Sequence, residues 1–230
     1  MTWGYSPLPK RGLDGLRLPP DQTLVVLAGR VTAASIPVSI LSERERERLE
    51  RFRFREDRER FIVAHGLKRR VCSALSGLPP SLLDFAETEH GKPFLPEGAF
   101  HFNLSHSGDW VGLVFHASDP VGIDVEQPRG KFDEQTEMLV FHPGDRIEGR
   151  SADRFYAAWT LKEAVSKSAG LGLALPFPEL RLEMETGGIG KGIYGRDIWQ
   201  VKHGVLENGA HLAIAGRNCV ANVRTVLVDG

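Results

Sequence analysis

The chain reads V-G-I-D-V-E-Q at residues 121–127, a stretch with the alternation of a β-strand. Alternate residues of a β-strand point to opposite faces. Val121, Ile123 and Val125 therefore share one apolar face, and Asp124 and Glu126 share the other. Two neighbouring carboxylates repel each other unless a positive group lies between them. We therefore expect the second face of this strand to hold a cation.

A third carboxylate comes from W-T-L-K-E-A-V-S-K at residues 159–167, inside a segment whose apolar spacing predicts a helix over 153–169. Glu163 and Lys167 are four residues apart and share a helix face, which is equally the pattern of a weak surface ion pair. Together with Asp124 and Glu126, Glu163 completes an all-oxygen set of ligands, which Mg²⁺ prefers. Mn²⁺ has the same preference, so ligand type does not choose between them. From the residues alone, the prediction is a metal site and a phosphate-bearing substrate, with no particular reaction.

Composition sets the broad class. The chain has 230 residues, of which 41% are hydrophobic, and a formal net charge of -1. This balance predicts no nucleic-acid or membrane-surface partner, and no run approaches the roughly 18 apolar residues of a membrane span. Neither a signal-peptide pattern nor a cysteine cluster is present, so we expect a cytoplasmic protein in which Cys72 and Cys219 are buried as small apolar residues.

The order of predicted elements repeats in two halves. A proline-rich, extended lead-in over residues 1–20 is expected to lie outside the core. The first lobe, 21–120, has a strand at 24–28, a helix capped by Ser42, a helix from Asp57 to about Leu75, and strands at 101–104 and 110–116. The second lobe, 121–230, has the motif strand, the motif helix and antiparallel strands at 180–184, 198–201, 211–215 and 223–228. We predict an α+β fold of two similar lobes related by a pseudo-twofold axis, each a helix packed on a small, mostly antiparallel sheet.

Three motifs in this order resemble one enzyme family. F-N-L-S-H-S at 102–107, G-I-D-V-E at 122–126 and W-T-L-K-E-A-V-S-K at 159–167 are similar to the signatures of 4′-phosphopantetheinyl transferases. The likeness is to the monomeric, surfactin-synthetase-activating type with two fused lobes, and it covers roughly residues 40–220. Such enzymes transfer the phosphopantetheine arm of coenzyme A to a serine of an apo acyl, peptidyl or aryl carrier protein. The resemblance thus implies a monomer with coenzyme A as co-substrate and a carrier protein as partner.

The resemblance also implies roles at the reacting end of the site. Asp124, Glu126 and Glu163 would coordinate Mg²⁺ together with the coenzyme A pyrophosphate. Glu163 would also be the base for the carrier serine. Lys167 would neutralise the pyrophosphate.

Three further residues match nucleotide-binding positions of that family. His106 and Arg60 would hold the 3′-phosphate, and Lys92 lies in a G-K-P turn that follows the adenine nucleotide. Each has an alternative that stays open: His106 as an ordinary loop histidine, Arg60 as an ion-pair partner of Glu56, and Lys92 as a solvent-exposed turn residue. Asn103 and Ser105 are expected to shape the loop rather than react.

One departure concerns the charged segment from 43 to 60. Some relatives carry several lysines there, whereas this chain alternates glutamate and arginine and includes Glu45. How many basic groups of this lobe reach the 3′-phosphate is therefore open. Apolar residues of the 127–150 region are expected to help a carrier protein dock.

Two other functions stay open at this point. One is a different Mg²⁺-dependent phosphoryl-transfer or hydrolytic enzyme built on the same three carboxylates. The other is a non-catalytic module that binds coenzyme A or carrier proteins.

Overall fold

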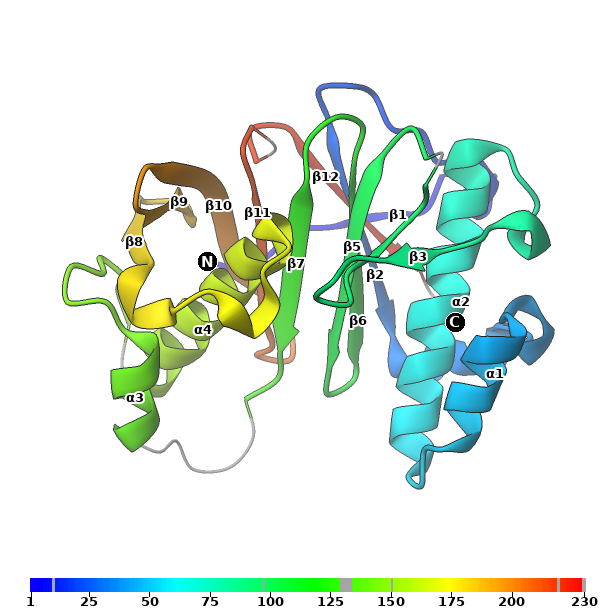
Figure 1. The fold of residues 1–230 in the computed structure, drawn as a ribbon, viewed down its shortest axis with the longest axis horizontal. Helices are drawn as coiled ribbons and strands as arrows, with labels where there is room; N and C mark the ends of the chain where they lie inside the picture. Colours follow the sequence, from blue (N-terminus) through cyan, green and yellow to red (C-terminus); the bar gives the residue numbers. More distant parts are fainter. Residues whose placement is uncertain (10, 97, 129–133, 150, 219, 229–230) are drawn as a thin grey trace.

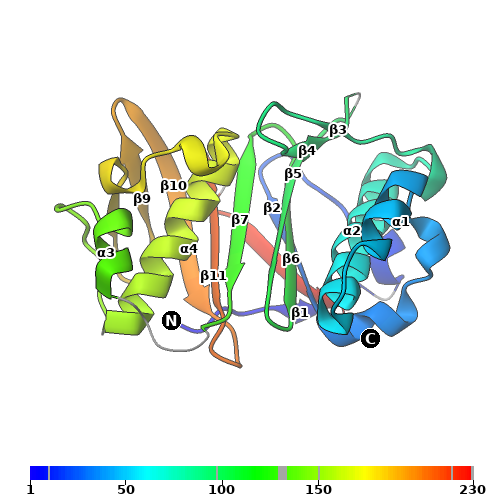
Figure 2. The ribbon, with the colours of Figure 1, turned by 60° about the horizontal axis from the view of Figure 1, so that its bottom comes forward.

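The centre of the molecule consists of two five-stranded sheets that lie against each other (Figure 1). The computed structural model describes residues 1–9, 11–96, 98–128, 134–149, 151–218 and 220–228. Helices cover the outer face of each sheet, which gives the order helix, sheet, sheet, helix in both views (Figure 2). The prediction of a two-lobed α+β fold is confirmed.

The first sheet carries the N-terminal lobe. Its strand order is β1 (Ser6–Pro7), β12 (Val223–Val228), β2 (Thr23–Gly29), β6 (Trp110–His116) and β5 (His101–Ser107). The long helix α2 (Arg55–Ser76) packs on its outer face through a core that includes Val63, Leu67 and Val71. The predicted helix end is confirmed, because Gly77 adopts the left-handed conformation with φ 76° and caps α2. A two-stranded ribbon, β3 (Ala86–Glu87) and β4 (Pro93–Phe94), follows.

Ser42 begins the short helix α1 (Glu43–Glu50), as predicted. Its hydroxyl accepts from the backbone N–H of Glu45, and the Glu45 carboxylate accepts from the backbone N–H of Ser42, which is a complete capping box.

The second sheet carries the C-terminal lobe and is entirely antiparallel. Its order is β7 (Val121–Glu126), β11 (His211–Gly216), β10 (Asp197–Val205), β9 (Ile189–Tyr194) and β8 (Arg181–Met184). The helix α4 (Ser151–Ala169) covers its outer face. Short 3₁₀ turns complete the chain: η1 (Gly12–Gly15), η2 (Arg30–Ser35), η3 (Val38–Ile40), η4 (Pro80–Leu82), η5 (Gly172–Ala174) and η6 (Phe177–Glu179).

The small helix α3 (Glu134–Val140) and the loop that follows it are tied to α4 by the buried ammonium of Lys162. The Lys162 ammonium donates to Asp145 at 2.8 Å and to the carbonyl oxygens of Val140 and Phe177. Because all these groups are buried, the satisfied ammonium fixes where α3 lies relative to the motif helix.

The prediction for residues 223–228 is wrong in partner and direction. These residues form β12, which leaves the C-terminal lobe and pairs in parallel with β2 and β1 of the first sheet. The physical reason is that β2 is buried on both faces and has two edges to satisfy, of which β6 takes only one. The predicted second lobe, 121–230, therefore does not contribute all of its strands to the second sheet.

The lead-in over residues 1–20 is also part of the core, contrary to expectation. Trp3 is 4% exposed, and its indole nitrogen donates to the Thr225 hydroxyl at 3.0 Å. Leu13 and Leu16 join the core beneath α2. The prolines favour an extended backbone, but the apolar residues between them gain free energy by burial in the core, and this holds the segment there.

The two sheets meet where β5 faces β7, and side chains replace the usual ladder there. Asn103 Oδ1 accepts from the backbone N–H of Ile123 at 3.1 Å, and the hydroxyls of Ser105 and Ser107 accept from the N–H groups of Val125 and Gln127 at 3.3 and 3.1 Å. These side chains alternate along β5, which extends through residues that were expected to be a loop. The polar residues of F-N-L-S-H-S thus join the lobes.

Two remaining predictions concern burial and membranes. Cys72 is a buried free thiol, as expected, whereas Cys219 lies outside the described residues. Among the helices of the described ranges, none is both long and apolar enough to cross a bilayer.

The close approach of α4 to β7 at Gly122 leads to the first prediction. A methyl group on Gly122 would overlap the backbone carbonyl of Ala164 and the backbone nitrogen of Ser168. Gly122→Ala should therefore lower the free energy of unfolding by about 3 kcal/mol, measured by urea denaturation. Gly4→Ala is the matched control, because its methyl group would meet no atom within 4 Å. Equal stability of the two variants would show that α4 does not contact β7 this closely.

Candidate functional site

The three predicted carboxylates lie along the contact of β7 with α4, close enough for their charges to interact. Val121, Ile123 and Val125 of β7 pack inward as expected. Asp124 and Glu126 occupy the other face, toward the helix that carries Glu163. The absence of a side chain at Gly122 lets α4 lie directly on the strand.

Lys167 binds the buried member of this group. Its ammonium lies 2.6 Å from Asp124 Oδ1 and 3.1 Å from the Ser105 hydroxyl, which itself donates to Asp124 Oδ1 at 2.8 Å. The i,i+4 pairing of Glu163 with Lys167 is therefore not the main contact. The Lys167 ammonium instead joins α4 to β7 and β5.

The surroundings of the three carboxylates disfavour their negative charge, and a bound cation would offset this. Burial raises the pKa of Asp124, Glu126 and Glu163, and mutual repulsion adds to this for Glu126 and Glu163. Asp124 Oδ2 is buried with no hydrogen-bond partner among the described residues. An unpaired carboxylate oxygen in such a place is ready for a positive ligand.

These three side chains are not arranged as a complete set of metal ligands. Within the described ranges, no three His, Cys, Asp or Glu side chains are gathered closely enough to ligate one ion. Lys167 occupies one Asp124 oxygen, and the Ser107 hydroxyl donates to Glu126 at 3.0 Å. The donor set suits a hard divalent cation held by one or two carboxylates plus water and phosphate, as Mg²⁺ usually is.

His106 and Arg60 lie near each other beside Glu126. Both line a cavity of about 400 Å³ together with Glu126. Arg60 donates to the carbonyl oxygen of Gly108 at 3.1 Å and pairs with Asp57, not with Glu56. Loss of solvent and the cations Arg60 and Lys167 lower the pKa of His106, which is the effect of a positively charged neighbourhood.

Lys92 is engaged by the C-terminal end of α4. Its ammonium donates to the carbonyl oxygens of Lys167 at 2.7 Å and Val121 at 3.0 Å. Burial lowers the pKa of Lys92 to about 8. A cation among the last carbonyl groups of a helix is favourable. The G-K-P turn of the first lobe thus holds the helix that presents Lys167.

A larger cavity opens on the other side of the carboxylates. It has a volume of about 1630 Å³ and is lined by Glu163, Lys167, His106 and Lys92 from the centre, and by α1 and α2 on one wall. This is ample room for a dinucleotide-sized ligand. His106, Phe52 and Phe61 line both cavities and lie between them.

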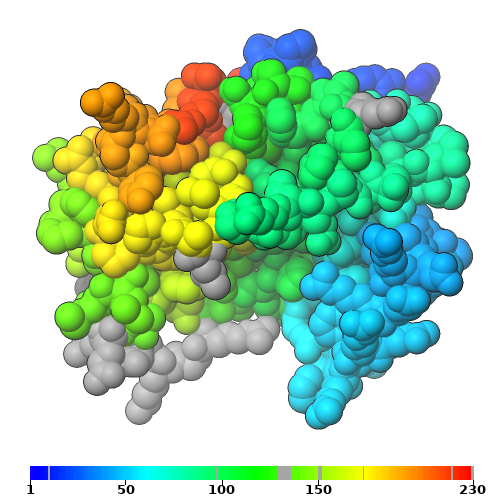
Figure 3. Space-filling model, in the orientation of Figure 1, coloured from blue at the N-terminus to red at the C-terminus, as the bar shows by residue number. Residues whose placement is uncertain are grey.

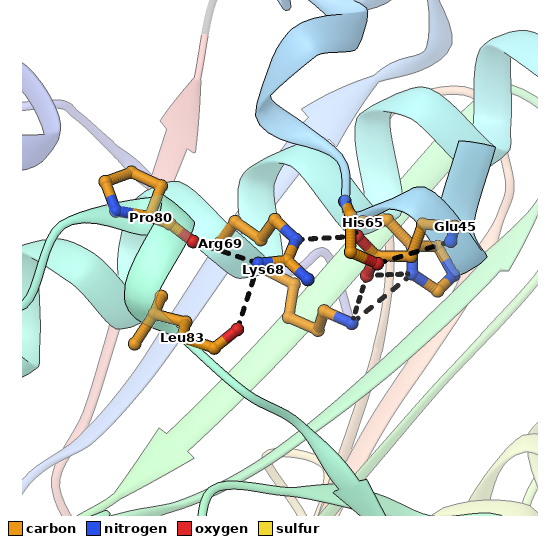
Figure 4. Close-up of polar contacts among 7 residues, drawn as sticks. Glu45, His65, Lys68, Arg69, Pro80 and Leu83 are labelled. Carbon is orange, nitrogen blue, oxygen red and sulfur yellow. Dashed lines mark hydrogen bonds and ion pairs between the residues drawn. The ribbon is translucent and has the colours of Figure 1, made fainter.

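Glu45 is a buried charge in the wall of that larger cavity, and sequence analysis did not anticipate its contacts. Its carboxylate binds the Lys68 ammonium at 2.8 Å, Arg69 Nε at 2.6 Å and His65 Nδ1 at 3.1 Å (Figure 4). Arg69 also donates to the carbonyl oxygens of Pro80 and Leu83. Burial opposes ionisation of Glu45, but the His65 hydrogen bond and the Lys68 charge outweigh it and hold the pKa below its usual range.

Fewer basic groups of this lobe are therefore available to a phosphate than the number of lysines and arginines suggests. Lys68 and Arg69 belong to the cavity wall, yet Glu45 neutralises part of their charge. Helical spacing would have placed 65, 68 and 69 on one face of α2, but only the tertiary structure brings Glu45 to them. Ser105 and Ser107 were likewise missed as partners of Asp124 and Glu126, although their alternation with Asn103 was visible in the sequence.

Comparisons with known proteins agree with these motifs. Residues 32–118 match a family model described as "4′-phosphopantetheinyl transferase, N-terminal", and residues 120–215 match the 4′-phosphopantetheinyl transferase superfamily. The chain is 35% identical over 159 residues to 4′-phosphopantetheinyl transferase Sfp of Bacillus subtilis, covering 66% of this chain and 70% of that protein. It is 35% identical over 170 residues to a phosphopantetheinyl transferase of Thraustochytrium sp., covering 64% of this chain and 59% of that protein.

The Glu45 cluster leads to a prediction on acid stability. A carboxyl group whose folded-state pKa lies below its unfolded value stabilises the fold above about pH 4.5, and this contribution is lost as the pH falls. Glu45→Gln should lower the free energy of unfolding at pH 7 by about 3 kcal/mol, and the variant should lose less stability than the wild type between pH 7 and 3.

Glutamine keeps the capping box, so the variant isolates the charge. Urea denaturation at both pH values measures it, with the exposed Glu47→Gln of the same helix as the control. If Glu45→Gln lost as much stability as the wild type between pH 7 and 3, Glu45 would not be the stabilising carboxylate.

Proposed function

Because this chain belongs to the 4′-phosphopantetheinyl transferase superfamily, and within it to the surfactin-synthetase-activating type, we propose that it activates carrier proteins. The reaction transfers the 4′-phosphopantetheine arm of coenzyme A to a serine of an apo acyl, peptidyl or aryl carrier protein. Adenosine 3′,5′-bisphosphate leaves. The observation that carries the proposal is the meeting of Asp124, Glu126, Glu163 and Lys167 beside a cavity of about 1630 Å³.

Bond changes follow from the chemistry of the transfer. The serine oxygen attacks the β-phosphorus of coenzyme A, a new phosphodiester forms, and the bond to the adenosine bisphosphate breaks. A bound Mg²⁺, or Mn²⁺, supplies positive charge where the leaving phosphate becomes more negative.

Asp124 and Glu126 are proposed to hold that ion, together with Glu163. The unpaired Asp124 Oδ2 and the raised pKa values of all three carboxyls support this role. Ser105 and Ser107 orient the two strand carboxylates by donating to them.

Glu163 and Lys167 are proposed as the catalytic pair. Burial raises the pKa of Glu163, which makes its carboxylate a better proton acceptor for the serine hydroxyl. The Lys167 ammonium is oriented by Asp124 and Ser105, so it can stabilise charge on the pyrophosphate without first being ordered.

His106, Arg60 and Lys92 are proposed to bind the nucleotide. His106 and Arg60 lie together in a positively charged region, which suits the 3′-phosphate. Lys92 lines the larger cavity, but its ammonium already bonds to backbone carbonyls, so its turn rather than its charge would meet the nucleotide.

The partners and setting remain part of the proposal. We propose a cytoplasmic monomer whose macromolecular partners are apo carrier proteins. A net charge of -1 gives no reason to expect binding to nucleic acid or membrane. Met138 and Leu139 of α3 are 82% and 69% exposed, which supports a docking role for the 127–150 region. Residues 129–133 of that region lie outside the described residues.

The direct test is intact-protein mass spectrometry of apo carrier proteins incubated with this protein, coenzyme A and Mg²⁺. We expect a mass gain of one phosphopantetheine arm, abolished by a chelator. Glu163→Gln and Asp124→Asn should each lower the initial rate at least about a hundredfold. The exposed Glu207→Gln is the control and should keep the wild-type rate.

Other outcomes would favour the two alternatives. Release of phosphate-containing product from coenzyme A without any carrier would indicate a hydrolytic enzyme. Carrier binding without a mass gain would indicate a binding module.

A further inference from the structure

The active carboxylates are reached from two sides. The larger cavity approaches Glu163 and Lys167, whereas the smaller one, of about 400 Å³, reaches Glu126 from the end of the molecule where the β5–β6 hairpin turns at Gly108. A transferase needs room for a donor and separate access for an acceptor. The larger cavity suits the donor, whose 3′-phosphate would lie between His106 and Arg60, where the two cavities adjoin. The part of the smaller cavity beside Glu126 is then left for the acceptor serine.

The corner between α1 and α2 reaches the smaller cavity through Phe52, and its sequence is R-F-R-F-R at residues 51–55. Phe52 points inward and lines both cavities. Phe54 is 68% exposed, an unusual position for a large aromatic side chain without a partner. We call residues 51–55 the arginine–phenylalanine corner.

The charges of this corner are only partly neutralised. Arg55 pairs with Glu59 at 2.6 Å. Arg51 and Arg53 are exposed, and among the described residues neither has an ion-pair partner. Two free guanidinium groups beside an exposed ring favour a partner that is acidic and has an apolar contact point, because arginine and aromatic side chains dominate such interfaces.

The corner lies at the same end of the molecule as the region already proposed for docking. Figure 1 and Figure 3 show α3 and the α1–α2 connection at that end, one on each lobe. A protein seated between them would touch both and would have the smaller cavity in front of it.

We propose that the arginine–phenylalanine corner is a docking surface for an acidic carrier protein, which it positions so that the acceptor serine enters the smaller cavity beside Glu126. This inference rests on the proposed function and adds to it the face and the charge of the partner. Phe54 supplies the apolar contact, and Arg51 with Arg53 supplies the electrostatic attraction.

The test compares Phe54→Ala and the double variant Arg51→Glu/Arg53→Glu with the wild type. Initial rates are measured over ranges of apo carrier and of coenzyme A. We expect KM for an acidic carrier to rise about tenfold or more in each variant, with kcat and KM for coenzyme A within about twofold of the wild type. Wild-type kcat/KM for the carrier should fall with added salt, and the double variant should lose most of that dependence.

Matched controls lie on the far sheet. Ile198→Ala removes a side chain that is 49% exposed, and Arg196→Glu reverses an exposed charge in the β9–β10 turn. Neither should change KM for the carrier.

Direct binding of the same carriers separates failure of this inference from failure of the proposed function. If the wild type transfers the arm and both variants keep its carrier KM, the docking surface is wrong. A rise of KM for coenzyme A alone would place the corner at the donor site instead, and a change only in oligomeric state would assign it to a second copy of this chain. If the wild type transfers nothing but binds carriers, loss of binding in the double variant would support the surface without the reaction. Absence of any carrier binding by the wild type would overturn both.

Discussion

The structure depends on the way β7 is held by β5. Each of these strands is the edge of its own sheet, so its backbone groups would otherwise face the junction unpaired. Asn103, Ser105 and Ser107 replace the missing ladder by accepting from the alternate N–H groups of Ile123 and Val125 in β7 and of Gln127 just after it. A regular ladder would have merged the two sheets into one. Side chains instead leave the sheets as separate layers and keep the Ser105 and Ser107 hydroxyls free to donate to Asp124 and Glu126.

Segments that cross from one lobe to the other also hold the lobes together, although the order of the chain does not predict these crossings. β12 returns to the first sheet, and residues 1–7 run from β10 to β12. Lys92 reaches from the first lobe to the carbonyl groups at the end of α4. The backbone of α4 packs directly on Gly122 of β7, and Lys92 binds the carbonyl groups at the end of the helix. Glu163 and Lys167 are therefore held in a fixed position relative to β7. Such preorganisation is what electrostatic catalysis requires.

Charge is arranged in opposite senses at the contact of β7 with α4 and at the α1–α2 wall of the larger cavity. At the contact of β7 with α4, the pKa values of Asp124, Glu126 and Glu163 are all raised, and Glu163 lines the cavity. On the α1–α2 wall, Glu45 instead takes up the charge of Lys68 and Arg69 and ties the two helices together. The wall therefore gains rigidity at the expense of attraction for phosphate. Among the described residues, Arg51 and Arg53 at the outer corner have no ion-pair partner, and neither do Arg44, Arg46 and Arg48 of α1.

By itself the sequence determined the local elements and the identity of the reacting groups. Alternation placed Asp124 and Glu126 on one strand face, Ser42 marked the start of α1, and apolar spacing marked the end of α2 near Leu75, because these features depend only on neighbouring residues. The ordered motifs identified the family for the same reason. Only the tertiary structure decided that β12 crosses to the other sheet, that the lead-in enters the core, and that Glu45 lies among His65, Lys68 and Arg69. Those contacts join residues far apart in the chain, and their geometry depends on how whole layers pack.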